Sequence, residues 1–218
     1  YNEFRRRGMP NRAVALVTET VVDPKDPAFQ NPTKPIGSFM DEATARMRHE
    51  QDGWTVVEDS GRGWRRVVPS PKPKRIIQES IIRELLEQGE TVIAVGGGGV
   101  PVAEAEDGTI SGLEAVIDKD LASSVLASSI GADLFLISTE VEKVALDFTK
   151  PSRRWLDKLT IAEAEEYLAQ GQFGKGSMEP KVSAVIDYLK RGGKEAIITN
   201  SENMSRALRG ESGTRFIP

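Results

Sequence analysis

The sequence predicts an α/β fold, in which helices cover a mostly parallel sheet, with a small helix-plus-hairpin subdomain. Two observations favour the α/β class. Amphipathic helical stretches alternate with short apolar strands along much of the chain, and one of these strands runs directly into four glycines, a pattern typical of α/β proteins. The subdomain is indicated by a third observation: a charged helical stretch precedes two β-type runs that flank a glycine turn.

The composition narrows the possible functions. The chain has 218 residues, 39% hydrophobic and 28% charged, which is ordinary for a globular protein with a sizeable core. Its 29 Lys and Arg against 33 Asp and Glu give a charge of −4, so we expect no nucleic-acid partner. No apolar run reaches the roughly 18 residues that would span a bilayer, so we expect no membrane partner.

The absence of cysteine and the single histidine exclude several kinds of chemistry. Without cysteine the chain forms no disulfide, thiolate metal site or cysteine nucleophile, and one histidine leaves little room for imidazole metal sites or a Ser-His triad. This composition predicts a cytoplasmic location.

The first part of the chain predicts a strand and then a shaped loop. Residues 1–8 have a helical pattern without a leader, and we expect them to lie inside a longer polypeptide. Residues 14–22 are rich in β-branched residues and predict a strand. Residues 23–37 contain four prolines, which remove backbone donors and favour a loop without regular structure.

The predicted subdomain follows this loop. Residues 41–50 predict a charged helix, and residues 54–57 and 64–68 predict a hairpin around the turn at 59–63. The proline-rich residues 69–73 end it.

The rest of the chain supplies the α/β pattern. An apolar stripe predicts a helix that includes Ile76, Ile77, Ile81, Ile82, Leu85 and Leu86 and ends at Gly89. The following predicted elements are a strand at 91–95, a helix at 119–130, a strand at 133–138, helices at 160–170 and 180–191, and a strand at 195–199.

Four glycines, Gly96, Gly97, Gly98 and Gly99, follow the strand at 91–95. Glycine lets the backbone approach a ligand closely and point amides at an anion, and α/β ligand sites lie at the carboxyl ends of strands. We favour anion or substrate contact over a merely flexible turn. No Gly-Lys-Ser/Thr follows, so this is not a Walker A loop.

Three lysines lie in settings that favour phosphate binding. Lys119 stands between Asp118 and Asp120 at a predicted helix start, where either carboxylate could instead simply cap the helix. Lys181 lies in the first turns of the helix that contains Pro180, which suits polyphosphate but is also a well-made helix start. Lys34 lies on the proline-rich loop, which could equally be a linker.

Five segments together resemble carbamate kinases of the amino acid kinase family, and the resemblance extends along the whole chain. The segments are Asp26-Pro-Ala-Phe-Gln-Asn-Pro-Thr-Lys-Pro-Ile-Gly37, Arg62-Gly-Trp-Arg-Arg-Val-Val-Pro-Ser-Pro71, Val95-Gly-Gly-Gly-Gly-Val-Pro101, Ala115-Val-Ile-Asp-Lys-Asp-Leu-Ala122 and Gly176-Ser-Met-Glu-Pro-Lys-Val182.

The resemblance implies a three-layer α/β/α sandwich with two lobes and a protruding subdomain. Residues 1–28 and 70–117 would form the remainder of an N-terminal carbamate-binding lobe, residues 29–69 the subdomain, and residues 118–218 a C-terminal nucleotide-binding lobe. It further implies reversible phosphoryl transfer between ATP and carbamate, which gives ADP and carbamoyl phosphate, with Mg²⁺. The implied role is arginine catabolism toward ATP, in a homodimer.

The resemblance also assigns roles to residues. It implies that Lys34 reaches the transferring phosphate, that Lys119 and Lys181 grip the phosphates, and that Asp120 orients them. Gly96 to Gly99, with Asp118, would line the substrate and phosphate site. The implied nucleotide-binding residues are Ser138, Thr139, Glu140, Lys143, Met178 and Lys181. No metal ligand from the protein is predicted.

The sequence departs from the family pattern in three places. Glu140 and Glu142 replace aspartates, and Glu179 replaces a glycine next to the phosphate-binding lysine. The family's opening strand with its Gly-Gly-Asn-Ala loop has no counterpart, so we expect about a third of the polypeptide to be absent before Tyr1. We therefore expect these 218 residues to bind adenine nucleotide and to turn over slowly.

Two alternatives remain open. One is another acid-phosphorylating kinase, such as an acetylglutamate or aspartate kinase, which the motif from Asn31 to Gly37 disfavours. The other is a non-catalytic nucleotide-binding member of the family.

Overall fold

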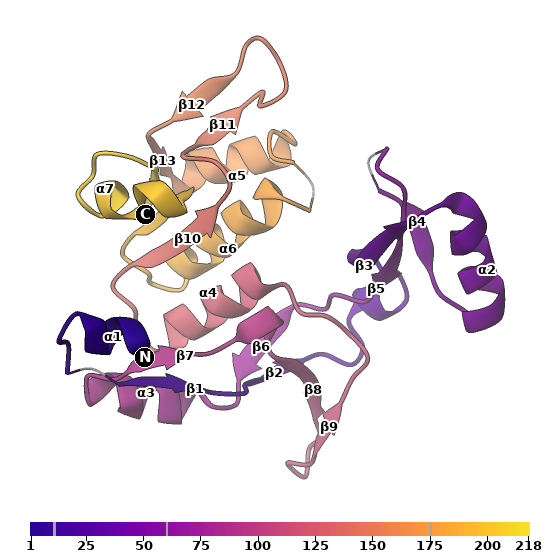
Figure 1. Cartoon of the computed structure of the whole chain (residues 1–218), viewed down its shortest axis with the longest axis horizontal. Coiled ribbons are helices and arrows are strands. Elements are labelled where there is room, and N and C mark those ends of the chain that lie inside the picture. The colour runs from indigo at the N-terminus through magenta and orange to yellow at the C-terminus, as the bar shows by residue number, and fades with distance from the viewer. Residues whose placement is uncertain (11, 60, 175) are drawn as a thin grey trace.

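The computed structural model describes residues 1–10, 12–59, 61–174 and 176–218. Each half of the chain is built on its own four-stranded sheet. Helix α4 (Lys119–Ser129) lies between the two halves, and a segment projects to one side (Figure 1). Within the described residues no helix is long and apolar enough to cross a membrane.

The C-terminal half is built on a four-stranded sheet with the order β10-β14-β15-β13. β10 and β14 are parallel, β15 is antiparallel to β14, and β13 is parallel to β15. Helix α6 packs against α4, α5, β10 and β14. The elements of this half after α4 are β10 (Phe135–Thr139), β11 (Val144–Leu146), β12 (Arg154–Leu156), β13 (Lys158–Thr160), α5 (Ile161–Ala169), α6 (Met178–Lys190), β14 (Ala196–Asn200), η3 (Ser201–Asn203), α7 (Met204–Leu208) and β15 (Thr214–Ile217).

The core of this half lies between α6 and the sheet. Tyr188 of α6 packs against Phe135 of β10, with ring centroids 5.4 Å apart, and its hydroxyl donates a hydrogen bond to the Ala132 carbonyl at 2.5 Å. Phe216 of β15 is fully buried in the same cluster. Burial of such aromatic side chains contributes a large share of core stability.

The N-terminal half contains a four-stranded sheet with the order β6-β2-β8-β9 and a separate parallel pair, β1 with β7. Its core gathers around Ile76, Ile82 and Ile117, and Val125 of α4 belongs to it, whereas Ala127 of α4 belongs to the C-terminal core. Its elements are α1 (Asn2–Arg6), β1 (Ala13–Ala15), β2 (Glu19–Val22), η1 (Pro27–Phe29), β6 (Pro73–Ile76), α3 (Glu79–Glu87), β7 (Thr91–Ile93), η2 (Gly96–Gly98), β8 (Val100–Glu104) and β9 (Ile110–Gly112).

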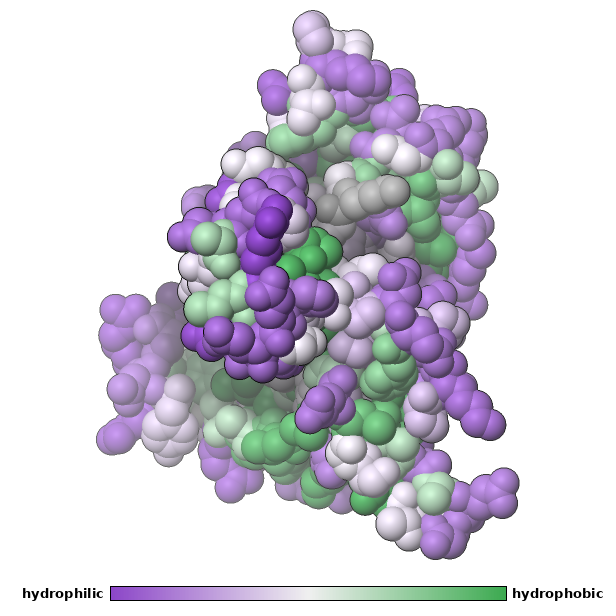
Figure 2. All heavy atoms as spheres, turned by 90° about the vertical axis from the view of Figure 1, so that its right-hand side faces the viewer, coloured by the Kyte–Doolittle hydropathy of each residue, from purple (hydrophilic) through white to green (hydrophobic). Residues whose placement is uncertain are grey.

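The projecting segment, residues 34–68, is a three-stranded antiparallel sheet with one helix against it. The strand order is β3-β5-β4, and Ala45 of the helix is fully buried. Figure 2 views the molecule from the side of this segment, and hydrophilic residues cover most of the visible surface. Its elements are β3 (Lys34–Met40), α2 (Glu42–Asp52), β4 (Val56–Glu58) and β5 (Trp64–Val68).

Some sequence expectations for the elements are wrong. The sheets are mixed instead of mostly parallel, because β6, β9 and β15 pair antiparallel with their neighbours. The strand expected at residues 14–22 is two strands in different sheets, separated near Val17, which is 82% exposed. The apolar stripe expected to be one helix begins with strand β6, which pairs with β2.

The proline-rich loop also differs from the expectation of irregular structure. Lys34, Pro35 and Ile36 form the start of β3 and pair with β5. Proline is tolerated there because β3 lies at an edge of its sheet.

Candidate active site

Helix α4 begins with a carboxylate cap. The Asp118 carboxylate accepts hydrogen bonds from the backbone N–H groups of Asp120 at 2.9 Å and of Leu121 at 3.3 Å. These are two of the donors that have no partner within the helix itself. Asp118 therefore has the capping role that the sequence left open.

Two ion pairs join distant parts of the chain to this helix start. Lys34 Nζ, at the base of the projecting segment, donates to Asp118 Oδ2 at 2.7 Å. Lys181 Nζ of α6 donates to Asp120 Oδ2 at 2.8 Å. Both carboxylates are buried. The first turn of α4 therefore holds two of the three predicted lysines, one from each side.

The third lysine stands between the two paired carboxylates. Lys119 is the first residue of α4 and is exposed. Its ammonium has no hydrogen bond or ion pair with another residue in the part of the chain that the structure describes. The positive end of the helix dipole adds to its charge. An anion that approaches this end meets an ammonium free to bind it.

The glycine loop packs directly against the start of α4. A Cβ on Gly98 would lie 2.3 Å from the Ile117 carbonyl oxygen, and a Cβ on Gly99 would lie 2.3 Å from Thr20 Oγ1. Gly97, Gly98 and Gly99 all have positive φ. Only glycine meets both requirements at Gly98 and Gly99 without strain. The loop and α4 therefore form one continuous surface.

Substitutions along this loop should differ sharply. We expect Gly98→Ala to lower the free energy of unfolding by about 2 kcal/mol or more, because a methyl group would collide with the Ile117 backbone at an unfavourable φ. A Cβ on Gly97 would have no atom within 4 Å, but the residue has positive φ, so we expect Gly97→Ala to lower the free energy of unfolding by about 1 kcal/mol. Gly96→Ala, which has neither problem, is the control. Urea unfolding measures the series, and equal costs at the three positions would contradict the packing described.

The predicted nucleotide residues lie along the C-terminal half. Ser138 and Thr139 end β10, and the exposed Glu140 follows them. Met178 begins α6, three residues before Lys181, and packs against the core of this half. Because α6 contacts β10, Met178 and Lys181 share a helix that lies against the strand of Ser138 and Thr139.

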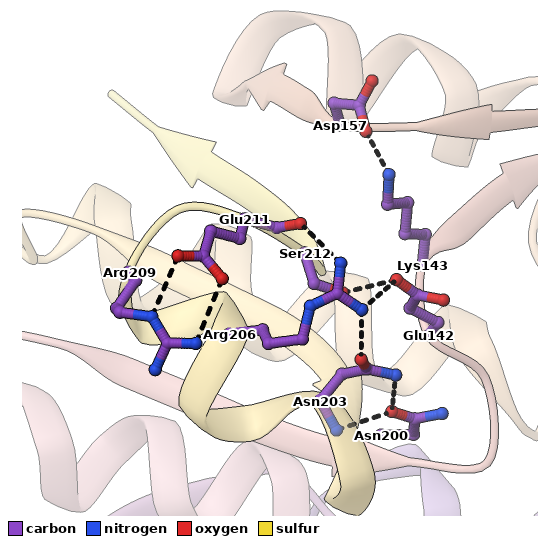
Figure 3. Close-up of polar contacts among 9 residues, drawn as sticks. All are labelled: Glu142, Lys143, Asp157, Asn200, Asn203, Arg206, Arg209, Glu211 and Ser212. Carbon is purple, nitrogen blue, oxygen red and sulfur yellow. Dashed lines mark hydrogen bonds and ion pairs between the residues drawn. The ribbon is translucent and has the colours of Figure 1, made fainter.

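Lys143 is engaged away from the lysine pairs described above. Its Nζ donates to Asp157 Oδ1 at 2.5 Å, and the preceding Glu142 accepts a hydrogen bond from Ser212 Oγ at 2.5 Å (Figure 3). Lys143 lines a depression of about 200 Å³ beside the loop at 210–213. The structure gives Lys143 an ion pair with Asp157 within its own half of the chain, and among the described residues its hydrogen bonds and ion pairs include none with Lys34, Lys119 or Lys181.

The Asp118 carboxyl is held in its ionised form. Burial is the largest single influence and disfavours the charge. The hydrogen bond and charge of Lys34, with the N–H groups of Leu121 and Asp120, outweigh burial and hold the pKa of Asp118 below its ordinary value of 3.8.

This lowered pKa predicts how stability depends on pH. A carboxyl with a depressed pKa in the folded protein contributes stability above its unfolded pKa, and the contribution is lost as the pH falls through the lower folded value. Above pH 5 we expect wild type to have a larger free energy of unfolding than Asp118→Asn. This difference should shrink as the pH falls below about 3.8. Urea unfolding at several pH values measures this, and a difference that stays constant down to pH 2 would contradict it.

The described residues contain no group of three or more His, Asp or Glu side chains that could hold a metal ion. Asp118 and Asp120 both already neutralise a lysine. These residues do not fit a metal centre built by the protein.

Sequence reasoning gave no role to Thr18 and Thr20. Both are buried and form hydrogen bonds to the glycine loop or the residue before it. The available signal was their spacing of two, which places both hydroxyls on one face of an extended segment.

Comparisons with known proteins identify the family of the chain. The family profile described as "Amino acid kinase family" matches residues 37–200. The chain is 50% identical over 216 residues to a carbamate kinase of Thermococcus kodakarensis, a match that covers 99% of this chain and 68% of the relative.

Two solved structures resemble the fold closely. Carbamate kinase from Giardia lamblia bound to citric acid has a TM-score of 0.91 and 41% identity, and the same enzyme bound to AMP-PNP has a TM-score of 0.87 and 42% identity. Each match covers 99% of this chain and 68% of the other. The chain therefore belongs to the amino acid kinase family, and within it to the carbamate kinases.

Proposed function

We propose that the chain is an enzyme that transfers a phosphoryl group reversibly between ATP and carbamate, with ADP and carbamoyl phosphate as the other pair. The observation that carries this proposal is the first turn of α4. There Lys34 and Lys181, from opposite sides, pair with carboxylates that flank the free Lys119. The names of the relatives at about 50% identity support the same reaction.

The chemistry needs no general base. Carbamate is already an anion, so its oxygen attacks the γ-phosphorus of ATP without losing a proton, and the bond from that phosphorus to the ADP oxygen breaks. Catalysis of such a transfer rests on in-line positioning and on cancellation of the charge that develops on the phosphoryl oxygens. The single exposed His49 in the projecting segment is not needed for this step.

Each lysine has a distinct part in the proposal. Lys34 and Lys119 contact the transferring group from the carbamate side, and Lys181 contacts it from the nucleotide side. An ammonium has three N–H donors, so Lys34 and Lys181 each keep donors for phosphate while one donor holds a carboxylate. Asp118 and Asp120 thus orient the lysines. The amides of Gly96 and Gly97 add further donors, whereas those of Gly98 and Gly99 donate to the carbonyls of Val95 and Gly96 within the loop.

The proposal includes partners that depend on the family resemblance. A kinase that uses ATP suggests a divalent metal, and we propose that it is Mg²⁺, which enters with the phosphates of the nucleotide. In this proposal, residues 1–28 and 70–117 belong to a lobe that binds carbamate, and residues 118–218 form a lobe that binds the nucleotide. Residues 29–69 form the projecting subdomain. We further propose that the protein is a cytoplasmic homodimer that forms ATP in arginine catabolism. The molar mass measured by light scattering tests the dimer.

ATP formation from carbamoyl phosphate and ADP tests the reaction. We expect the chain to form ATP in a coupled assay with Mg²⁺, but more slowly than the Thermococcus kodakarensis relative, which is assayed beside it as the positive control. ADP binding without ATP formation, also in a polypeptide extended to the full length of the relative, would overturn the proposed reaction and favour a non-catalytic nucleotide-binding member of the family. Phosphorylation of acetylglutamate or aspartate in place of carbamate would favour the other alternative.

A further inference from the structure

Two buried threonine hydroxyls hold the glycine loop from the side of the core. Thr18 and Thr20 are 2% and 0% exposed. Thr18 Oγ1 accepts a hydrogen bond from the backbone N–H of Val95 at 2.9 Å. Thr20 Oγ1 donates one to the Gly98 carbonyl at 2.7 Å. The two hydroxyls therefore fix the residue that enters the loop and the residue near its end.

The entry residue is in a conformation that needs such support. Val95 has φ of +56°, in the left-handed region that a β-branched side chain rarely adopts. Strain of this kind persists only where the surroundings enforce it. The Val95 amide is bonded to Thr18, and the Val95 carbonyl accepts the Gly98 N–H at 3.0 Å. The peptide units before and after Val95 are thus both held.

The Thr20 contact fixes both the direction of a carbonyl and the position of the loop. Because the Gly98 carbonyl points into the buried Thr20 hydroxyl, its negative end is turned away from an anion at the start of α4. The same Oγ1 occupies the space beside Gly99 where a Cβ would lie. Gly98 in turn packs against Ile117, the residue before Asp118.

We propose that Thr18 and Thr20 are positioning residues of the phosphoryl-transfer site: their hydroxyls keep the glycine loop in the strained form that supports the start of α4 and leaves the Gly96 and Gly97 amides to donate to the transferring group. The expected effect of the two threonines on catalysis rests on the proposed function. The hydrogen bonds to the loop stand independently of that function.

Four variants and one matched control test the structural step. Thr18→Val and Thr20→Val remove the hydroxyl at nearly constant volume, and Thr18→Ser and Thr20→Ser keep it. Thr199→Val is the control, because Thr199 is a fully buried threonine in β14 whose hydroxyl has no partner among the described residues. Hydrogen exchange of residues 95–100 is the readout.

We expect the valine variants to raise exchange of the loop amides about 10-fold to 100-fold, because a buried partner loses its hydrogen bond. The effect of Thr18→Val should be largest at the Val95 amide, which loses its acceptor. The serine variants and Thr199→Val should exchange like wild type. Unchanged exchange in both valine variants would overturn the proposal.

The rate of ATP formation tests the catalytic step. A displaced loop should lower kcat about 10-fold to 100-fold with a smaller change in KM for ADP, and serine should restore kcat. Loosened exchange with an unchanged kcat would overturn the positioning role. If wild type forms no ATP, the proposed function fails, and the exchange comparison alone then decides whether the threonines hold the loop.

Discussion

Replacing Lys119 by alanine should lower the rate of ATP formation about 100-fold to 1000-fold, which is the usual loss when one donor to a developing charge is removed. The fold should survive, because the Lys119 side chain is exposed and holds no other described residue. We therefore expect kcat to fall while the midpoint of urea unfolding stays within experimental error of wild type.

Lys194→Ala is the matched control for this prediction. Lys194 is also an exposed lysine, it pairs with Asp133, and it precedes β14 at the end of the strand opposite to Asn200. Its loss should leave kcat unchanged, because Lys194 lies at the end of β14 opposite to Asn200. It should also change the unfolding midpoint little, since exposed ion pairs contribute little to stability. A Lys119→Ala enzyme with the activity of the Lys194→Ala enzyme would remove Lys119 from the mechanism.

Variants of Lys181 and Asp120 should show that the ion pair affects stability and activity in different ways. The two side chains are only 14% and 11% exposed. Asp120→Ala or Lys181→Met alone leaves one buried charge without its partner, which typically costs about 3–5 kcal/mol of stability. The double variant removes both charges, so we expect it to regain most of that stability.

Activity should not return with stability in the double variant. Lys181→Met removes a cation from the transferring group, and the expected loss of about 100-fold to 1000-fold in kcat remains when Asp120 is also replaced. Urea unfolding and the coupled assay on the same four proteins measure this. A double variant that recovers kcat would show that Lys181 serves only to neutralise Asp120.

The sequence predicted well those elements whose signals are local. The helix expected at 119–130 is α4 (Lys119–Ser129), because the Asp118 cap and the apolar spacing are both encoded within one turn or two. The helix expected at 160–170 is α5, whose start at Thr160 is a complete capping box with Glu163.

Elements set by distant pairing were predicted poorly. Ile76 has the spacing of the helix that follows, but it pairs with Thr20 in a neighbouring strand, 56 residues earlier. Local periodicity does not contain that information. The short strand β8 pairs with β2 on one side and with β9 on the other, and the local sequence pattern predicted neither β8 nor β9.

The candidate site follows the same division. The three lysines and the two aspartates that flank Lys119 stand in recognisable local motifs, so sequence reasoning named them. Which carboxylate holds which lysine depends on contacts across 84 and 61 residues, and only the structure places Lys34 on Asp118 and Lys181 on Asp120. Thr18 and Thr20 lie in a segment with the pattern of an apolar strand. The sequence does not indicate which distant groups their hydroxyls bond, because those partners lie 77 and 78 residues away.

A crystal structure with ADP, Mg²⁺ and aluminium fluoride tests most directly whether the three ammonium groups share one phosphoryl group. The account predicts that Nζ of Lys34, Lys119 and Lys181 each lies about 2.7–3.2 Å from a fluoride or a β-phosphate oxygen. A fluoride group bound at the nucleotide with none of these lysines within hydrogen-bond distance would contradict it.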